Sequence, residues 1–503
     1  MKKKVTWLVV SGGMGLALLL SACAPAVVEE EKVVPKEEVV TPREEVVPRE
    51  VVVPQAETNL VKWTGTKKDG TVVERMIEKP RYGGVAIVTA KDDPITFDDI
   101  TRHGGDNTAT TLINESLLMG DWTRSPAGTG DFGLSGNKFF LPYSVEVGSL
   151  ATSWEKPDDS TLIFHIRKGI RFALNLTSEA SRLVGGRELT ADDVVYGTRR
   201  MFTKGNLRRD YPFLVDMKNV EKSIYVSPDD PWSMVIKTQP GTTAGIYRHV
   251  SVGRNKIIAP EVIAKYGELT TEKWRHVVGT GPMFLKEYVT ASALIYARNP
   301  DYWGHDPFFP ENQLPYLDGV RYLIIPDEST RLAAIRTGRV DSLSGAGLGE
   351  TALSSEDFRS LLKTNPDMQF AKSLQTGGVS IHPRNDVKPF DDVRVRRALM
   401  MAINYRELLD DYWEGDAEMF VSPVTPIVEN KGYYIPLEQM PESVQELYGY
   451  RPDKARQLLA EAGYPQGFKT EIITRTEWVD ILSIIKEHWA KIGVELTLNV
   501  KDP

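Results

Sequence analysis

Two hydrophobic periodicities alternate along the C-terminal part of the chain, and this alternation is the strongest constraint on its fold. Apolar residues first follow the helical spacing i, i+3, i+4, i+7, i+8, at Val395, Ala398, Leu399, Ala402 and Ile403. The same spacing returns in residues 455–462 and 481–492. Residues 494–500 then switch to period two, which is typical of a strand. Interleaved helices and strands predict a mixed α/β class.

Further elements are expected upstream. A helix after Thr190 has Asp192 and Asp193 in its first turn, and its inward residues are expected to be Val194, Val195, Thr198, Met201 and Phe202. Another helix is expected over 107–118. Strands are expected at 83–89, 161–167 and 233–237, and a hairpin from 283–289 and 293–298. We expect folded structure to begin near Tyr82.

The N-terminus has the architecture of a secretory signal. Residues 1–22 combine three lysines with an apolar run that is too short and too rich in glycine for a good membrane span. Leu20-Ser21-Ala22-Cys23 resembles the bacterial lipoprotein signal, in which cleavage precedes a cysteine that is then lipidated. The alternative is a plain signal peptide with a chance cysteine. Because Cys23 is the only cysteine, no disulfide can form within the chain.

A proline-punctuated segment follows the cysteine. Residues 24–58 contain the near-repeat EEVVTPREEVVPREVVVP, no aromatic residue and many like charges. Recurring prolines prevent helices, and this composition favours a solvated tether. We therefore expect residues 23–79 to hold the lipidated Cys23 and a disordered tether, on the outer face of the cytoplasmic membrane.

Charge and motifs exclude several chemistries. The net charge of −8 argues against a nucleic acid partner, because phosphate binding needs clustered Lys and Arg. The seven histidines are scattered, and neither HExxH nor GxSxG occurs. Helix-dipole stabilisation explains paired acids such as Asp192/Asp193 and Asp391/Asp392 better than acid–base catalysis does. Inspection leaves a distant pair of glycosidase carboxylates open. We expect no catalytic residues, no cofactor and no metal.

Two local features admit alternative interpretations. Gly279-Thr280-Gly281 resembles a phosphate loop, but Pro282 and a strand follow where such a loop needs a helix start, so a tight turn entering a strand is favoured. The chain also has ten tryptophans and 19 tyrosines, which can line a sugar or peptide groove. The tryptophans expected to be exposed, from their loop-like polar surroundings, are Trp122, Trp303 and Trp413.

Six segments together resemble one family, the extracytoplasmic solute-binding proteins of ABC importers of the peptide/nickel type, solute-binding family 5. They are LIFHIRKGIRF (162–172), ELTADDVVYGTRRM (188–201), GTGPMFLKEY with ARNPDYWG (279–304), DESTRLAAIRTGRVD (327–341), PFDDVRVRRALMMAIN (389–404) and DKARQLLAEAGYPQGF (453–468). They follow the family's order over residues 82–500, so their combination is specific although each one alone is weak.

The resemblance implies a two-lobed clamshell of the type II periplasmic-binding-protein kind, with an extra domain inserted in lobe I. Lobe I would comprise residues 80–118 and 248–326, the inserted domain 119–247, and lobe II 327–503. Pro326 and Asp327 would form one hinge. Strand-end loops would bind the ligand between the lobes. The expected ligand-binding residues are His103, Gly104, Gly105, Asp106 and Asn107 from lobe I, with Gly377, Gly378, Val379 and Ser380 opposite.

The resemblance also implies function. A lipid-anchored, monomeric, non-enzymatic binding protein would capture peptides and deliver them to a permease driven by an ATPase. Oligosaccharides and nickel or other metal chelates stay open as ligands. An anchored extracellular hydrolase and a ligand sensor are the alternatives from other classes. Family members continue well beyond the strand that matches VELTLNV (494–500), so a truncated lobe II and a missing acidic loop are expected.

Overall fold

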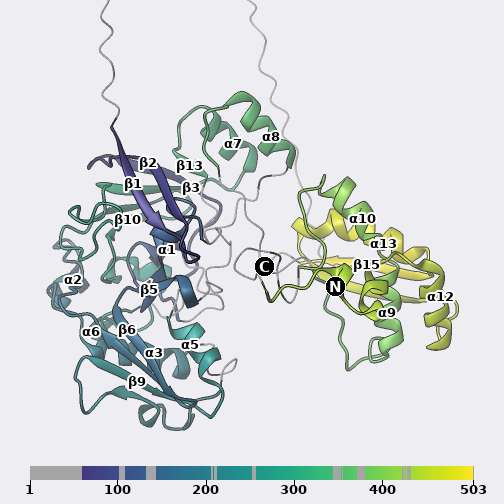
Figure 1. Cartoon of the computed structure of the whole chain (residues 1–503), viewed down its shortest axis with the longest axis horizontal. Helices are drawn as coiled ribbons and strands as arrows, with labels where there is room; N and C mark the ends of the chain where they lie inside the picture. Colours follow the sequence, from purple (N-terminus) through teal and green to yellow (C-terminus); the bar gives the residue numbers. More distant parts are fainter. Residues whose placement is uncertain are drawn as a thin grey trace, which may run out of the picture. The chain divides into compact units, whose positions relative to one another are not determined.

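The structure is a computed structural model, and the description concerns the compact unit Asn59–Pro503 (Figure 1). It describes residues 59–100, 108–131, 143–205, 208, 212–251, 257–343, 353, 355–370, 380–421, 424, 426 and 432–501. The predicted signal peptide, Cys23 and most of the predicted tether lie outside these residues.

Ordered structure begins earlier than expected. Strands β1 (Leu60–Thr66) and β2 (Val72–Glu78) pair antiparallel, from Leu60 opposite Glu78 to Thr66 opposite Val72. The expectation that folded structure begins near Tyr82 is therefore wrong. Residues 55–79 hold no proline and place Val61, Trp63 and Gly65 at alternate positions, so one side of β1 is partly buried. A proline-free alternating segment can pair where the preceding repeat cannot.

A five-stranded sheet holds the first core. Its order is β10-β11-β12-β3-β13, in which β12 and β13 run parallel to β3 and the remaining pairs are antiparallel. Its strands are β3 (Val85–Ala90), β10 (Met283–Val289), β11 (Ala293–Arg298), β12 (Gly319–Ile324) and β13 (Ser342–Leu343). The expected 283–289/293–298 hairpin is confirmed. Because β13 is hydrogen-bonded to β3, residues beyond Asp327 still contribute to this sheet; the lobe boundaries themselves stay predictions.

The helix expected over 107–118 is wrong in extent. Helix α1 covers only Thr108–Thr111, and β4 (Leu118–Gly120) follows, paired with β5 (Glu146–Gly148). The carbonyl of Ile113 accepts the N–H of Gly281 at 2.7 Å, and that of Leu112 accepts the N–H of Met283 at 3.0 Å. These carbonyls serve a distant segment and therefore do not continue a helix.

A second sheet shares the first core. Its order is β6-β7-β9-β8, all antiparallel, and its strands are β6 (Ala151–Asp158), β7 (Thr161–Ile166), β8 (Ile224–Val226) and β9 (Ser233–Lys237). The nearby helices are α2 (Glu179–Val184), α3 (Ala191–Thr203), α5 (Thr243–Ser251) and α6 (Pro260–Tyr266). Buried side chains from Ala90 to Ile324 form one continuous cluster, so the residues of the predicted inserted domain and of lobe I pack together.

Helix α3 forms as its sequence predicts. The five residues expected inward are all buried, and α3 packs on β8 and β9. Asp193 is buried as well: it accepts the backbone N–H of Thr190 at 2.8 Å and binds both terminal nitrogens of Arg187 at 2.7 and 2.8 Å. Asp192 stays exposed. The helix-dipole interpretation of Asp192 and Asp193 is therefore incomplete, since Asp193 also forms an ion pair with Arg187.

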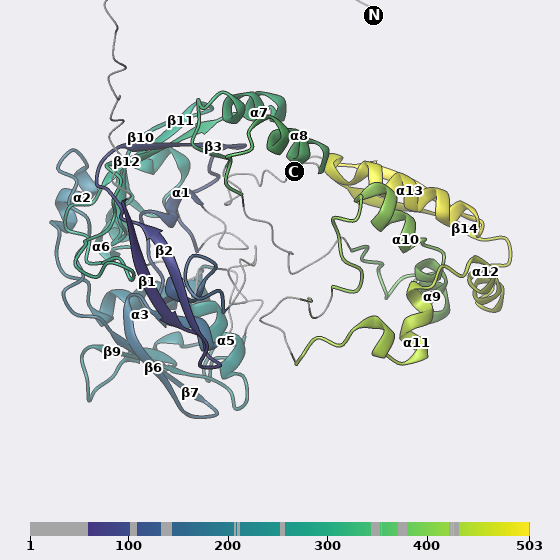
Figure 2. The ribbon, with the colours of Figure 1, turned by 45° about the horizontal axis from the view of Figure 1, so that its top comes forward.

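Residues 393–500 build a separate second core. Its members run from Val395 to Leu496. Helices α9 (Val393–Met401) and α12 (Pro452–Glu461) lie side by side, while α13 (Val479–Ala490) packs on β15 (Figure 2). Strands β14 (Phe468–Thr474) and β15 (Val494–Val500) are parallel. The three helices and the terminal strand predicted from periodicity are confirmed. Short helices α10 (Tyr405–Glu407) and α11 (Glu442–Gln445) complete this part.

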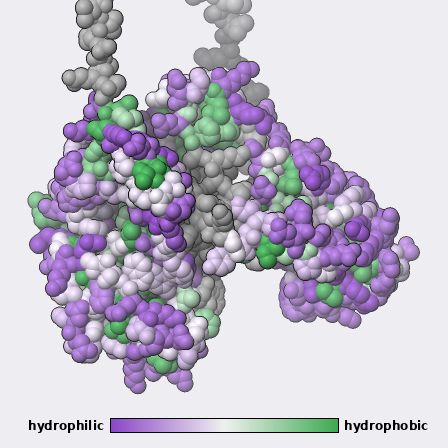
Figure 3. All heavy atoms as spheres, viewed as in Figure 1, coloured by the Kyte–Doolittle hydropathy of each residue, from purple (hydrophilic) through white to green (hydrophobic). Residues whose placement is uncertain are grey.

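Two helices, α7 (Glu328–Arg336) and α8 (Ser355–Thr364), lie along the chain between β12 of the five-stranded sheet and the residues of the second core. Helix α7 precedes β13, and α8 follows it. Arg336 donates to the hydroxyl of Ser360 at 3.0 Å, which joins the two helices. On the face drawn in Figure 3, apolar residues form small separate areas within a mainly hydrophilic surface. Across the described part of the chain, every helix is too short or too polar to span a bilayer.

Candidate functional site

The parallel strands β3 and β12 end at the same edge of the first sheet. Because β12, β3 and β13 run parallel, their carboxyl ends share an edge. The N–H of Ile325 donates to the carbonyl of Ala90 at 2.8 Å, so β3 and β12 end together. The chain after β3 leads to the predicted ligand loop, and the chain after β12 is the predicted hinge. Ligands of open α/β folds bind outside such an edge.

Most predicted ligand residues lie outside the described residues. These are His103, Gly104, Gly105, Asp106 and Asn107, together with Gly377, Gly378 and Val379. Ser380 is described: it is exposed, and its hydroxyl lies 2.7 Å from Nε2 of His382. Its ligand contact stays a prediction.

A buried arginine supports the predicted hinge residues. The side chain of Arg331, on α7, donates to the carbonyls of Ile325 and Pro326, both at 2.7 Å. Asp327 caps α7 by accepting the N–H and hydroxyl of Thr330 at 2.7 and 2.6 Å. These hydrogen bonds hold the pKa of Asp327 below its usual value. The strand-to-helix link is thus held by side chains on both sides, while its movement as a hinge stays a prediction.

One carboxylate gathers several of the motif segments. Glu115 accepts the hydroxyl of Thr280 at 2.8 Å, the hydroxyl of Tyr302 at 3.0 Å and the indole N–H of Trp303 at 3.1 and 3.2 Å. The guanidinium of Arg167 lies 4.7 Å from the Trp303 ring centre. Burial raises the pKa of Glu115 to about 7, and the three donors oppose that rise only in part. Glu115 therefore binds both ends of segment 279–304, and Arg167 of segment 162–172 packs on the Trp303 ring that Glu115 holds.

Sequence reasoning missed Glu115. It lies in the short stretch Asn114-Glu115-Ser116 and belongs to no periodic pattern. Its partners are 165 to 188 positions away along the chain. Their presence in recognised motifs was the available signal, since buried polar residues such as Thr280 require a partner.

The glycines around Thr280 permit this contact. A Cβ on Gly279 would lie 2.2 Å from the carbonyl oxygen of Ile113, and one on Gly281 would lie 2.6 Å from that of Leu112. The Gly281 N–H is already bonded to Ile113, and β10 begins two residues later. The tight-turn interpretation is confirmed, because this N–H is engaged within the fold.

The expected aromatic exposure holds for one residue of three. Trp122 has 62% of its surface exposed. Trp303 is partly buried through Glu115 and Arg167. Trp413 packs at 5.0 Å from Tyr412 against the second core. The expectation of exposure is wrong for these two, because an indole beside polar residues can bury its ring while its N–H finds a partner.

One grouping of serine, histidine and acid occurs on the second sheet. The hydroxyl of Ser233 lies 2.7 Å from Nδ1 of His165, and Nε2 lies 3.2 Å from Glu155. However, Ser233 is buried and donates its hydroxyl to Asp230. An attacking hydroxyl must be accessible and must donate its proton to the base, whereas this hydroxyl is buried and donates to Asp230, so the arrangement does not fit a nucleophile. Within the described ranges, no three His, Cys, Asp or Glu side chains are arranged to hold a metal.

The chain is similar to proteins of one known family. The model of the family "Bacterial extracellular solute-binding proteins, family 5 Middle" matches residues 146–503. Heme-binding protein A of Haemophilus influenzae is 28% identical over 368 residues, which cover 69% of this chain and 60% of the relative. The dipeptide-binding protein of Escherichia coli is 27% identical over 376 residues, covering 71% and 64%. The chain thus spans about three fifths of the length of these relatives.

Solved structures agree on the fold. The periplasmic binding protein DppA of Helicobacter pylori, in complex with the peptide STSA, has a TM-score of 0.58 at 24% identity, covering 84% of this chain and 74% of its own. AppA of Bacillus subtilis, in complex with a nonapeptide, has a TM-score of 0.59 at 21% identity, covering 84% and 76%. The predicted two-lobed α/β class is confirmed. The chain belongs to the bacterial extracellular solute-binding proteins, family 5.

Proposed function

We propose that this chain is the solute-binding component of an ABC importer and that its ligand is a peptide. The observation that carries the proposal is the family match over residues 146–503. The sheet edge at Ala90 and Ile325 is consistent with it, because ligands of open α/β folds bind beyond the carboxyl ends of parallel strands, and β3 and β12 end together there. In this proposal the protein captures its ligand by closure of two lobes and passes it to a permease and an ATPase.

The names of the relatives guide the ligand class. The Escherichia coli relative is a dipeptide-binding protein, and the solved complexes contain the peptide STSA and a nonapeptide. These names favour a peptide for this chain. The Haemophilus influenzae relative is a heme-binding protein, which makes heme the second candidate. Oligosaccharides and metal chelates are retained from the sequence as further arms of the test.

A binding role is favoured over a hydrolase. In the part of the chain that the structure describes, the Ser233–His165 pair resembles nucleophile chemistry, but the hydroxyl is buried and directed to Asp230. Glu115, the carboxylate with a pKa near 7, is surrounded by donors from its own scaffold. Both groups serve packing in this proposal.

We also propose that the protein works outside the cytoplasmic membrane, as a monomer linked to lipid at Cys23. The support comes from the sequence Leu20-Ser21-Ala22-Cys23 and from the extracellular nature of the family. A single acyl chain holds a protein only marginally at a membrane, so a second chain or contact is expected to strengthen the anchor.

Ligand-induced stabilisation tests the proposal. The protein lacking residues 1–23 is titrated separately with a di- to nonapeptide mixture, heme, oligosaccharides and a nickel chelate, while thermal unfolding and product formation are followed. A saturable rise in Tm with peptides and without product is expected. A rise in Tm with heme alone would replace peptide by heme as the ligand. Turnover of any compound refutes the binding role, and the absence of stabilisation in every arm refutes the proposed function of this chain.

A further inference from the structure

The β1–β2 hairpin precedes β3, the first strand of the five-stranded sheet. It lies outside the range 146–503 that the family model matches. Its open end is closed by two hydrogen bonds between Asn59 and Lys79: the Lys79 N–H donates to the Asn59 carbonyl at 2.7 Å, and the Asn59 amide donates back at 2.9 Å. An isolated two-stranded hairpin is marginally stable in water, so its order requires other contacts.

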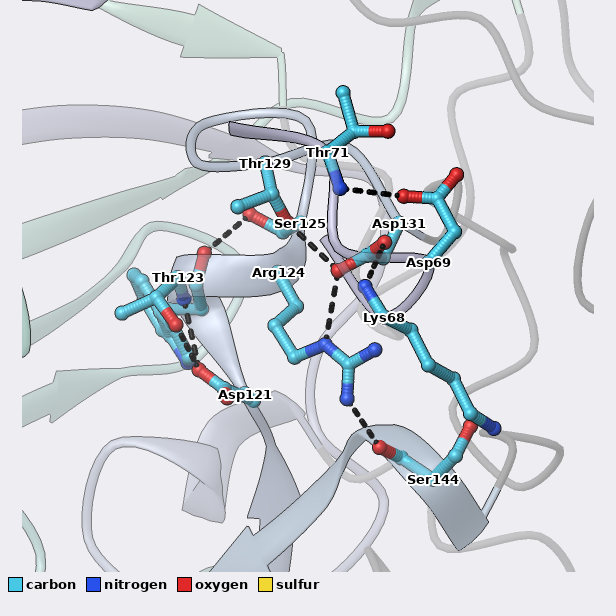
Figure 4. Close-up of polar contacts among 11 residues, drawn as sticks. Lys68, Asp69, Thr71, Asp121, Thr123, Arg124, Ser125, Thr129, Asp131 and Ser144 are labelled. Carbon is cyan, nitrogen blue, oxygen red and sulfur yellow. Dashed lines mark hydrogen bonds and ion pairs between the residues drawn. The ribbon is translucent and has the colours of Figure 1, made fainter. Parts of the chain in front are cut away.

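Asp131 provides the contact at the hairpin turn (Figure 4). Its carboxylate accepts the backbone N–H of Lys68 at 3.2 Å, from the turn. It also accepts Nε of Arg124 at 3.0 Å and the hydroxyl of Thr129 at 2.9 Å, both from the loop 121–131. Burial acts to raise the pKa of Asp131, but the donors from Thr129, Arg124 and Lys68 outweigh it and leave the pKa below its usual value.

The loop 121–131 is also held by a hydrogen bond to Ser144, outside the loop, and by one within the loop. Arg124 donates to the carbonyl of Ser144 at 2.6 Å, and Asp121 accepts the N–H of Thr123 at 2.9 Å (Figure 4). Asp69, by contrast, accepts only the N–H of Thr71 among the contacts drawn, at 2.9 Å, within the hairpin turn. Asp131 therefore joins two segments, whereas Asp69 serves one.

Further contacts run along the strands. The guanidinium of Arg75 donates to the carbonyl of Pro126 in the loop. A Cβ on Gly65 would lie 2.8 Å from the methyl of Thr129, so β1 approaches the loop closely. The ring of Trp63 meets Phe308 edge to face at 5.2 Å. The hairpin thus contacts both the 121–131 loop and the segment that follows β11.

The link from the hairpin to β3 is also attached. Gly83 and Gly84 have φ of +114° and +81°, a conformation that favours glycine and turns the chain sharply. Tyr82 donates its hydroxyl to the carbonyl of Gln313 at 2.7 Å, and the Gly84 N–H donates to Asp318 at 3.0 Å. The hairpin is consequently held at its turn, along its strands and at its exit.

We propose that the β1–β2 hairpin is a strap: it pins the loop 121–131 to the first core, and the loop in turn holds the hairpin, so that the two open together. This coupling depends on two side chains: Asp131 of the loop, which binds the hairpin turn, and Arg75 of the hairpin, which binds the loop. It does not depend on which ligand the protein binds.

Hydrogen exchange of the full chain tests the coupling with two pairs of variants. Asp131→Ala removes the acceptor on the loop side, and Asp69→Ala is its matched control in the turn. Arg75→Ala removes the donor on the hairpin side, and Lys62→Ala is its control, because Lys62 pairs with Glu74 within the hairpin. Peptides from β7 and β9 report whether the first core remains folded.

Coupling predicts effects on the opposite segment. Asp131→Ala is expected to speed exchange in residues 60–78, and Arg75→Ala in residues 121–131, each by about tenfold, while β7 and β9 stay protected. The controls Asp69→Ala and Lys62→Ala are expected to leave hydrogen exchange in residues 121–131 unchanged. Faster exchange confined to the mutated segment overturns the strap. If Asp131→Ala also exposes β7 and β9, the Arg75→Ala pair decides, because that side chain is exposed and its loss leaves the core intact.

Discussion

The carboxylate of Glu115 accepts the indole N–H of Trp303 at 3.1 Å, across 188 positions of the chain. Thr280 and Tyr302 bind the same carboxylate, and Arg167 lies over the indole ring. A buried carboxylate loses its hydration, and the three neutral donors replace the lost water hydrogen bonds only in part. Glu115 therefore joins segments of the first core at the cost of holding a carboxylate whose pKa is about 7.

Glu115→Gln is expected to change the pH dependence of stability. The folded-state pKa of about 7 lies above the ordinary value of 4.5, so this group's stabilisation is fully present below pH 4.5 and is lost as the pH rises through 7. The free energy of unfolding of the variant, relative to wild type, should rise between pH 4.5 and 8 by on the order of 3 kcal/mol. Urea unfolding at both pH values measures it. Glu287→Gln, an exposed carboxylate on β10, is the control. A pH-independent difference contradicts the prediction.

Asp193→Ala is expected to destabilise the first core by about 2 to 3 kcal/mol, because it removes one of the two bidentate carboxylate partners of Arg187 and the Asp193 half of the α3 capping box. Arg187 keeps Glu261, at 2.8 Å, so the loss is less than that of an isolated buried charge. Asp192→Ala, one position away and exposed, should cost less than about 1 kcal/mol. Denaturant unfolding compares the two, and equal losses would assign the effect to the helix dipole instead.

Leu459→Ala is expected to loosen the second core alone. Leu459 is 1% exposed, between α12 and α9, and its truncation should cost about 2 to 4 kcal/mol. Leu458→Ala, at a partly buried neighbour, should cost less. Hydrogen exchange should increase in β14 and β15 and stay unchanged in β7 and β9, because the two cores form separate clusters. Matching increases in both sets of strands would mean that the cores unfold as one.

Cys23→Ser is expected to abolish incorporation of labelled palmitate and to release the protein from the membrane fraction. The thiol of Cys23 is the only one in the chain, so the labelling has a single expected site. Ala22→Gly, a conservative change beside the cysteine, serves as the matched control and should still be labelled. An unlabelled wild-type protein, or a labelled Cys23→Ser protein, removes the proposed anchor.

The sequence alone was sufficient to predict a helix or strand wherever its apolar residues repeat at the spacing of that element. The helices containing Val395, Leu459 and Ile485 and the strand beginning at Val494 all appear where expected. Their buried faces are read from neighbours within two turns or a few strand positions, so no distant contact is required. The family resemblance rests on the same local segments, and it predicted the fold class correctly.

Distant contacts decided the rest. The sequence by itself determined the α/β class, the principal helices and strands, and the absence of disulfides within the chain. The tertiary structure ended α1 at Thr111 by directing the carbonyls of Leu112 and Ile113 to residues 281–283, gathered three donors on Glu115, and ordered β1–β2 through Asp131. The physical reason is that a polar group's free energy depends on whether a partner replaces water, and these partners meet only after the chain has folded.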